Sequence, residues 1–210
     1  MMRYQKLYVS VTLAIFIACF STVVVRAQQQ TPIDGIDARA NAAELAKQLS
    51  DADPNVRQRS AEALARLAAA DQSKLVEGYY LQEKNKEVRL ALDWALYRFG
   101  KTEPLFRIVH ELDSGRQLQA IGYLSQLESP AALYPFLKKE KNPARVSVGL
   151  LKALAQIGNA QTLDVIKPYL ESVQPYVAEA AESATDEINK RLSEGEASTT
   201  RSRPRVAKPE

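Results

Sequence analysis

The sequence predicts an all-α protein built as an α-solenoid of about five helix pairs. Two observations lead to this fold class. Apolar residues recur with helical spacing at intervals of about thirty residues, and no segment alternates apolar and polar residues as a half-buried strand would. Repeats of this length are typical of stacked helical units, because a single helix pair cannot bury both of its apolar faces.

Each repeat is defined by four positions spaced +0, +4, +8 and +11, which form one stripe along a helix of about 3.6 residues per turn. The repeats start at residues 56, 88, 116, 146 and 177, so the spacings are 32, 28, 30 and 31 residues. Alanine at the +7 position places a small side chain beside the stripe, where a neighbouring helix can approach closely. These alanines are Ala63, Ala95, Ala153 and Ala184.

Proline and glycine residues set the expected ends of the helices. We predict that the second helix of each pair starts near residues 54, 86, 115, 144 and 175, with a proline in the first turn at Pro54, Pro143 and Pro175. Asp53 and Asn142 are expected to be N-caps. The first helices carry apolar faces of their own, and we expect kinks at Pro135 and Pro168.

The pattern that identifies a repeat family lies in the first two repeats. Residues 51–64 read Asp-x-Asp-Pro-x-Val-Arg-x-x-Ser-Ala-x-Ala-Leu, and residues 86–92 read Lys-Glu-Val-Arg-x-Ala-Leu. This resembles the HEAT repeat, particularly the short bacterial form also found in phycobilisome lyases, over about residues 38–192. The resemblance implies a right-handed stack, second helices on the concave side, and binding of other macromolecules. The Val-Arg pair is absent from the later repeats, where Gln117, Ser147 and Ala178 replace the arginine, and this weakens the expected ladder of contacts between turns.

The N-terminal residues 1–27 are expected to be a signal peptide. Arg3 and Lys6 precede an uncharged run, Leu7 to Val25, and Val25-Arg26-Ala27 fits a cleavage site before Gln28. The mature chain is then exported, either to a periplasm or to the medium. In one alternative the 19-residue run stays as a membrane anchor, with the repeats outside the cytoplasm. In the other, the single cysteine, Cys19, is acylated as in a lipoprotein.

The rest of the chain divides into a flexible lead-in over 28–37, the repeat domain over 38–192 and a disordered tail over 193–210. The chain has 28 basic and 25 acidic residues, and the signal peptide contains three of the basic residues and no acidic residue. The mature chain therefore has 25 of each and is neutral. A neutral chain gives no reason to expect nucleic acid or an anionic membrane as the partner.

The residues offer little for catalysis. His110 is the only histidine and Cys19 leaves with the signal peptide, so neither a metal site nor a nucleophile with its base can be assembled. The glycines are scattered and form no phosphate-binding loop. We therefore expect no enzyme activity, no cofactor and no metal. An enzyme or small-ligand-binding protein that uses the concave groove is kept as the alternative.

The candidate binding residues lie on the second helices, away from the buried stripe. Most of these positions are polar, but the second repeat carries Trp94 and Tyr97 beside Arg98, and these residue types are enriched in interface hot spots. We predict a partner-binding site on these three residues, flanked by Glu62, Arg66 and Lys152 on adjacent second helices. The alternative is that Trp94 packs against the following repeat. The expected function is a monomeric, non-catalytic scaffold that binds another protein.

Overall fold

The computed structural model describes residues 33–139 and 142–201, and over these residues the chain is helical and contains no strand. The all-α class predicted from the sequence is therefore confirmed. The α-helices are α1 (Ile33–Gln48), α2 (Pro54–Leu67), α3 (Ser73–Gln82), α4 (Lys86–Arg98), α5 (Glu103–His110), α6 (Gln117–Leu124), α7 (Tyr134–Leu137), α8 (Ala144–Ile157), α9 (Ala160–Ile166) and α10 (Pro175–Arg201). Short 3₁₀ turns lie between several of them.

The chain divides into two units, with the boundary after Ala40. In the first unit, the described residues are the beginning of α1. The second unit begins at Asn41 and contains the rest of α1 and all the other helices. The predicted signal peptide, the anchor and lipoprotein alternatives and Cys19 lie outside the described residues.

The second helices begin close to the predicted positions, at Pro54, Lys86, Gln117, Ala144 and Pro175. The stripe that defined the repeat forms much of the core. Fourteen of its twenty positions are buried, among them Leu64, Leu92, Leu124, Leu154 and Ile188. Helical periodicity predicted these elements well, because the residues on the buried face of an amphipathic helix recur every three to four positions in the sequence.

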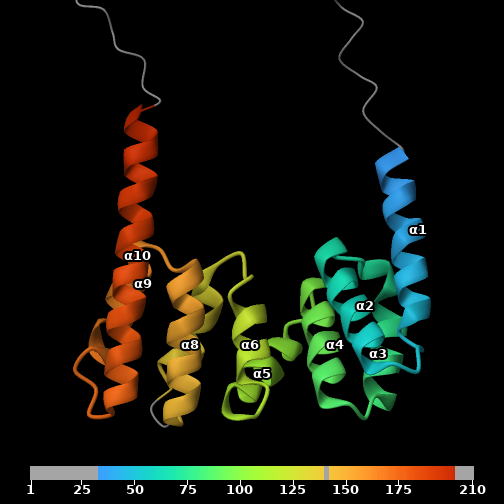
Figure 1. Cartoon of the computed structure of the whole chain (residues 1–210), viewed down its shortest axis with the longest axis horizontal. Coiled ribbons are helices and arrows are strands. Elements are labelled where there is room, and N and C mark those ends of the chain that lie inside the picture. The colour runs from blue at the N-terminus through green and yellow to red at the C-terminus, as the bar shows by residue number, and fades with distance from the viewer. Residues whose placement is uncertain (1–32, 140–141, 202–210) are drawn as a thin grey trace, which may run out of the picture. The chain divides into compact units, whose positions relative to one another are not determined.

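Consecutive second helices contact one another in chain order, α2 with α4, α4 with α6, α6 with α8 and α8 with α10 (Figure 1). Each later second helix also contacts the first helix of its own pair: α3 with α4, α5 with α6, α7 with α8 and α9 with α10. In the first pair, Ser60 Oγ on α2 donates a hydrogen bond of 2.8 Å to Gln48 Oε1 on α1. The row of second helices is therefore the continuous part of the packing.

The second helices are not equally close to one another. α2 and α4 approach along much of their length, as do α8 and α10, whereas α4 and α6 meet at few points. The closely packed helices bury small side chains, such as Ala61 on α2 and Ala95 on α4, or Ala153 on α8 and Ala184 on α10. Small residues let helix backbones approach, so the residues at this interface set the spacing.

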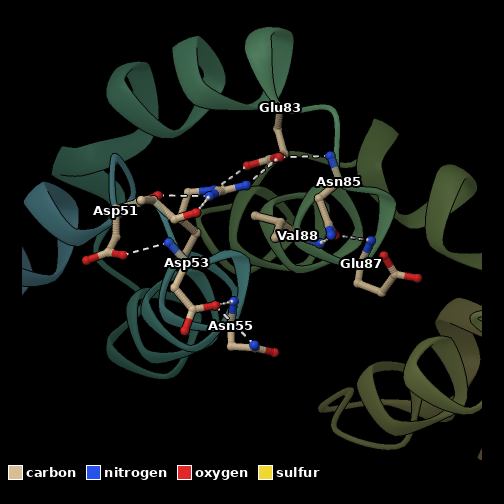
Figure 2. A network of polar contacts seen from close by, with 9 residues as sticks. Asp51, Asp53, Asn55, Glu83, Asn85, Glu87 and Val88 are labelled. Carbon is tan, nitrogen blue, oxygen red and sulfur yellow. Dashed lines mark hydrogen bonds and ion pairs between the residues drawn. The ribbon is translucent and has the colours of Figure 1, made fainter.

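A polar network joins the turn before α2 to the turn before α4 (Figure 2). Arg57 donates from Nε and Nη2 to the two carboxylate oxygens of Glu83, at 2.7 and 3.0 Å, and from Nη1 to the carbonyl oxygens of Asp51 and Ala52. Glu83 also accepts from the backbone N–H of Asn85, at 2.8 Å. This is the contact between turns that the Val-Arg pair led us to expect in the first repeat.

The caps of the second helices follow the prediction at one position and differ at another. Asp53 caps α2 by accepting from the backbone N–H of Asn55 at 2.9 Å, as expected. Asn142 does not cap α8, and that prediction is wrong. Its Nδ2 donates to the carbonyl oxygens of Phe136 and Leu137 and so closes the end of α7. The sequence did not show that α7 would end with open carbonyl groups within reach of this amide.

Both prolines that were expected to kink first helices do interrupt them. The chain passes from a 3₁₀ helix, Pro130–Leu133, into α7 just before Pro135, and α9 gives way to a 3₁₀ helix, Lys167–Tyr169, that contains Pro168. A proline lacks the N–H that would bond to the carbonyl four residues earlier, and in both cases the type of helix changes at the residue before the proline.

Two expected boundaries differ from the structure. α10 continues to Arg201, although we predicted a disordered tail over 193–210. α1 begins at Ile33, inside the predicted lead-in over 28–37. After Pro175, at the start of α10, the next proline in the chain is Pro204. The helix can therefore extend beyond residue 193, because adding a residue to an existing helix is far easier than starting a new one. At the other end, Gly35 lies in the first turn of α1, where a glycine interrupts the helix least.

Candidate functional site

The structure brings together four of the six residues predicted to bind a partner. Glu62 lies on α2, and Trp94, Tyr97 and Arg98 lie on the neighbouring α4. Arg66 is exposed near the end of α2 and does not join this cluster. Lys152 lies on α8, in a separate pocket.

Trp94 is not an exposed anchor, and this part of the prediction is corrected. Its side chain is only 3% exposed. Its ring is stacked on Tyr123 of α6, with centroids 5.5 Å apart and an angle of 2° between the planes, and on Tyr97, at 5.8 Å and 18°. The guanidinium of Arg98 lies 5.8 Å from the ring centroid. Trp94 therefore packs against the following repeat, which was the alternative interpretation.

Tyr123 ties α6 to α2 across α4. Its hydroxyl donates a hydrogen bond of 2.7 Å to Glu62 Oε1 and accepts one of 2.8 Å from Gln119 Nε2. Glu62 Oε1 also accepts from Gln58 Nε2 at 3.0 Å. Burial raises the pKa of the Tyr123 phenol far above its ordinary value, so the hydroxyl keeps its proton and remains a donor.

The rings fill the gap between α4 and α6, where the helix backbones meet at few points. The stacked rings and the hydrogen bond from Tyr123 to Glu62 link α2, α4 and α6. Trp94 has almost no area left to offer a partner.

The sequence also contains a signal for the role of Tyr123. Tyr123 is the +7 residue of the third repeat, the position that holds alanine in the other four repeats. The residue before it, Gly122, occupies the +6 position that Trp94 fills in the second repeat. A large ring in a place kept small elsewhere indicates that the neighbouring helix stands further away.

An open pocket lies between α8 and α10. It has a volume of about 350 Å³, and its lining includes Lys152, Gln156, Ser183 and Glu187, the +6 and +10 residues of the last two repeats. Glu179 and Tyr176 complete its polar rim, and the Tyr176 side chain is 76% exposed. They belong to the mostly polar positions of the second helices, away from the buried stripe, that the sequence offered as candidates for binding.

The described part of the chain gives no geometry for metal binding or for a membrane span. No group of three or more histidine, cysteine, aspartate or glutamate residues within it is placed to hold a metal ion. His110 is exposed at the last residue of α5. None of the described helices is both long enough and apolar enough to cross a bilayer.

Comparison of the chain with models of known protein families and with curated proteins found no match. The HEAT resemblance therefore rests on the residues of the repeats themselves.

Proposed function

We propose that this protein is an exported, non-catalytic scaffold, a right-handed HEAT-like solenoid that binds another protein through the α8–α10 end of its second-helix face. The observation that carries the proposal is the pocket between these helices, where Tyr176 is 76% exposed beside the charged rim of Lys152, Glu179 and Glu187. Tyrosine is enriched in interface hot spots, and a partly polar rim is usual around them.

The packing supports the solenoid part of this proposal. Second helices contact one another in chain order, as neighbouring repeats of a solenoid do, and the repeated stripe supplies the core between them. The handedness and the family follow from the resemblance of residues 51–64 and 86–92 to the HEAT repeat.

The chemistry of the pocket supports a protein rather than a small molecule as the partner. Its rim carries one basic and two acidic residues, so charges of both signs surround the exposed tyrosine ring. An interface between proteins pairs such charges around an apolar contact, whereas a small-ligand site encloses most of its ligand.

The export part of the proposal depends on residues 1–27. We expect the mature chain to begin near Gln28, outside the cytoplasm, and in the periplasm if the source is a bacterium with two membranes. Intact-mass measurement of the protein purified from its own cells separates the three outcomes. A retained N-terminus would mean a membrane anchor, and a lipid mass on Cys19 would mean a lipoprotein.

The binding part is tested by capture with matched variants. The full chain carries a C-terminal tag in its own cells, and the retained proteins are compared for the wild type, Tyr176→Ala, Lys152→Ala and Leu118→Ala. Leu118 on α6 is 81% exposed and does not line this pocket, so it controls for nonspecific apolar binding. Each variant should change the free energy of unfolding by less than about 0.5 kcal/mol.

We expect at least one partner protein to be retained by the wild type and by Leu118→Ala, and to be lost with Tyr176→Ala and weakened with Lys152→Ala. If no captured protein depends on Tyr176, the proposed surface is wrong. Turnover of a substrate, or a bound small molecule displaced by changes in this pocket, would favour the enzyme or ligand-binding alternative instead.

A further inference from the structure

A second pocket, of about 320 Å³, lies at the junction of α3, α4 and α5. It shares no lining residue with the pocket between α8 and α10. Its lining combines basic, acidic and aromatic residues: Tyr80, Lys86, Arg89, Leu90, Asp93, Phe106, Arg107, His110, Glu111 and Arg116. With His110 neutral, four basic and two acidic side chains leave the pocket with a net charge of +2.

Both acidic residues of this pocket are already occupied by arginines. Asp93 is 5% exposed, and its Oδ1 accepts from Arg107 Nε and Nη2, each at 2.7 Å. Glu111 Oε2 accepts from Arg116 Nε and Nη2, at 2.8 and 2.6 Å. Their negative charge is therefore neutralised at close range, and the excess positive charge belongs to Lys86 and Arg89.

Arg89 lacks the carboxylate that its counterpart in the first repeat has. Arg57 and Arg89 both occupy the +1 position of their repeats, and Glu83 and Glu111 both stand five residues before the start of the next repeat. Arg57 binds Glu83, but Glu111 is held by Arg116, which replaces the apolar residue at the start of the third repeat. Within the described residues, neither Arg89 nor Lys86 forms an ion pair.

Tyr80 holds the unpaired guanidinium of Arg89 in place. The guanidinium carbons of Arg89 and Arg107 each lie 5.0 Å from the centre of the Tyr80 ring, and the Tyr80 hydroxyl accepts a hydrogen bond of 3.4 Å from Arg89 Nη2. A guanidinium held on a ring face loses less conformational freedom on binding than a free side chain does. The pocket therefore presents a positioned cation.

An apolar pocket adjoins this basic pocket. Phe106 on α5 is 63% exposed and lines both pockets, and its ring lies 6.1 Å from that of Phe136 at an angle of 49°. The apolar pocket has a volume of about 250 Å³, and Val109, Pro143 and Val146 also line it. A ligand lying along α5 would meet positive charge on one side of Phe106 and apolar side chains on the other.

We propose that this surface binds an acidic peptide segment of a partner protein. A carboxylate side chain of the segment lies between Lys86 and Arg89, and a neighbouring aromatic or aliphatic side chain packs on Phe106 and Phe136. Charge complementarity decides the class of ligand, because this one pocket carries a net charge of +2 on a chain whose 28 basic and 25 acidic residues are otherwise nearly balanced. The proposal concerns different helices from those of the proposed function and does not rest on it.

Fluorescence anisotropy with a labelled synthetic peptide of alternating glutamate and phenylalanine tests this inference on the purified full chain at low salt. Lys86→Gln and Arg89→Gln should each weaken binding about fivefold, and the double variant about tenfold or more. Phe106→Ala should weaken it about tenfold. A peptide with glutamine in place of glutamate should bind the wild type as weakly as the original peptide binds the double variant. A peptide with alanine in place of phenylalanine should lose about as much affinity as Phe106→Ala causes.

Lys86→Gln separates lost binding from lost folding. Lys86 is the first residue of α4, and a positive charge at a helix N-terminus is unfavourable, so its removal should leave the urea midpoint unchanged or slightly raised. Leu118→Ala provides the matched apolar control.

Peptide binding that is equal in the wild type and in the Lys86/Arg89 double variant would overturn the proposal. So would equal binding of the glutamine peptide, because the contact would then be purely apolar. Inorganic phosphate is added as a competitor to test for a small-anion site. If phosphate displaces the peptide when both are present at the same concentration, the pocket recognises a free anion instead. Self-association on sedimentation that is lost in the double variant would make a second copy of the chain the occupant.

Discussion

The α4–α6 junction and the α8–α10 junction are built from the same repeat positions, but one is closed and the other is open. At +6 and +7, the first junction carries Trp94 on α4 and Tyr123 on α6, and their rings stack in the space between helices that meet at few points. The second junction has Lys152 and Ser183 at +6 and alanines at +7. There the helices approach closely and the polar residues remain at the surface.

This difference shows that the residue types at a junction do not by themselves indicate a binding surface. Tryptophan and tyrosine are enriched in hot spots, but at this junction Trp94 is 3% exposed and Tyr123 is 5% exposed. The junction with ordinary polar residues at the same positions keeps an open pocket with one exposed tyrosine. Aromatic residues compensate here for a wide helix spacing, and that role is structural.

The largest effect should come from removing the ring that fills the closed junction. Trp94→Ala should lower the free energy of unfolding by about 3–5 kcal/mol, because the buried ring leaves a cavity between α4 and α6. Denaturation by urea measures this. The matched change in the open junction, Tyr176→Ala, should leave the free energy of unfolding almost unchanged. A loss below about 1 kcal/mol for Trp94→Ala would show that the rings do not hold the junction.

The next effect should come from the turn network of the first two repeats. Arg57→Ala should lower the free energy of unfolding by about 1.5–3 kcal/mol, since Glu83 is 9% exposed and would lose charge-assisted hydrogen bonds. Lys47→Ala removes an ion pair whose partners are both largely exposed and is the control. Equal effects of the two changes would mean that the network adds nothing beyond surface charge.

The same ion pair predicts a dependence on pH. The hydrogen bond from Arg57 lowers the pKa of Glu83, so the folded pKa lies below the unfolded pKa. The stabilisation is therefore fully present above the unfolded pKa of about 4.3 and is lost as the pH falls through the folded pKa. Urea denaturation at pH 7 and at lower pH should show the difference between wild type and Arg57→Ala shrinking in acid. A constant difference would contradict this reading.

Two glycines test how tightly the junctions are packed. A Cβ on Gly158, at the end of α8, would lie 2.6 Å from the Leu154 carbonyl oxygen and 2.6 Å from Ile188 Cδ1 of α10. Gly158→Ala should therefore cost about 1–3 kcal/mol. Gly122 on α6 has nothing within 4 Å of such a Cβ, and Gly122→Ala should stabilise the helix by about 0.5–1 kcal/mol. Thermal unfolding of the two variants shows whether each change raises or lowers stability. If Gly158→Ala is stabilising, α8 and α10 do not approach closely at Gly158.

The smallest effect should come from the hydrogen bond that spans the closed junction. Tyr123→Phe keeps the ring stack but removes the donor to Glu62, and should cost about 1 kcal/mol. Glu62→Gln keeps an acceptor at the same place and should cost less. If Tyr123→Phe is as stable as the wild type in urea denaturation, the Tyr123 hydroxyl does not tie α6 to α2.

The sequence by itself determined the helices and their buried faces. The +0, +4, +8 and +11 stripe placed the second helices to within about two residues, as shown by the starts at Pro54, Lys86 and Ala144. It did so because amphipathic periodicity and helix ends depend on residues a few positions apart. The limits of α1 and α10 were less predictable, since polar segments without proline are compatible with either a helix or a tail.

Only the tertiary structure decided which of these faces are open. Trp94 is buried because Tyr123, on another helix, stacks on it, and Tyr123 in turn donates to Glu62, which is 61 residues away in the chain. Among the described residues Arg89 has no ion-pair partner, because Arg116 holds the carboxylate that the repeat pattern would have assigned to it. Periodicity states which side of a helix is apolar, but exposure depends on how far apart neighbouring helices stand and on which side chains fill the space between them.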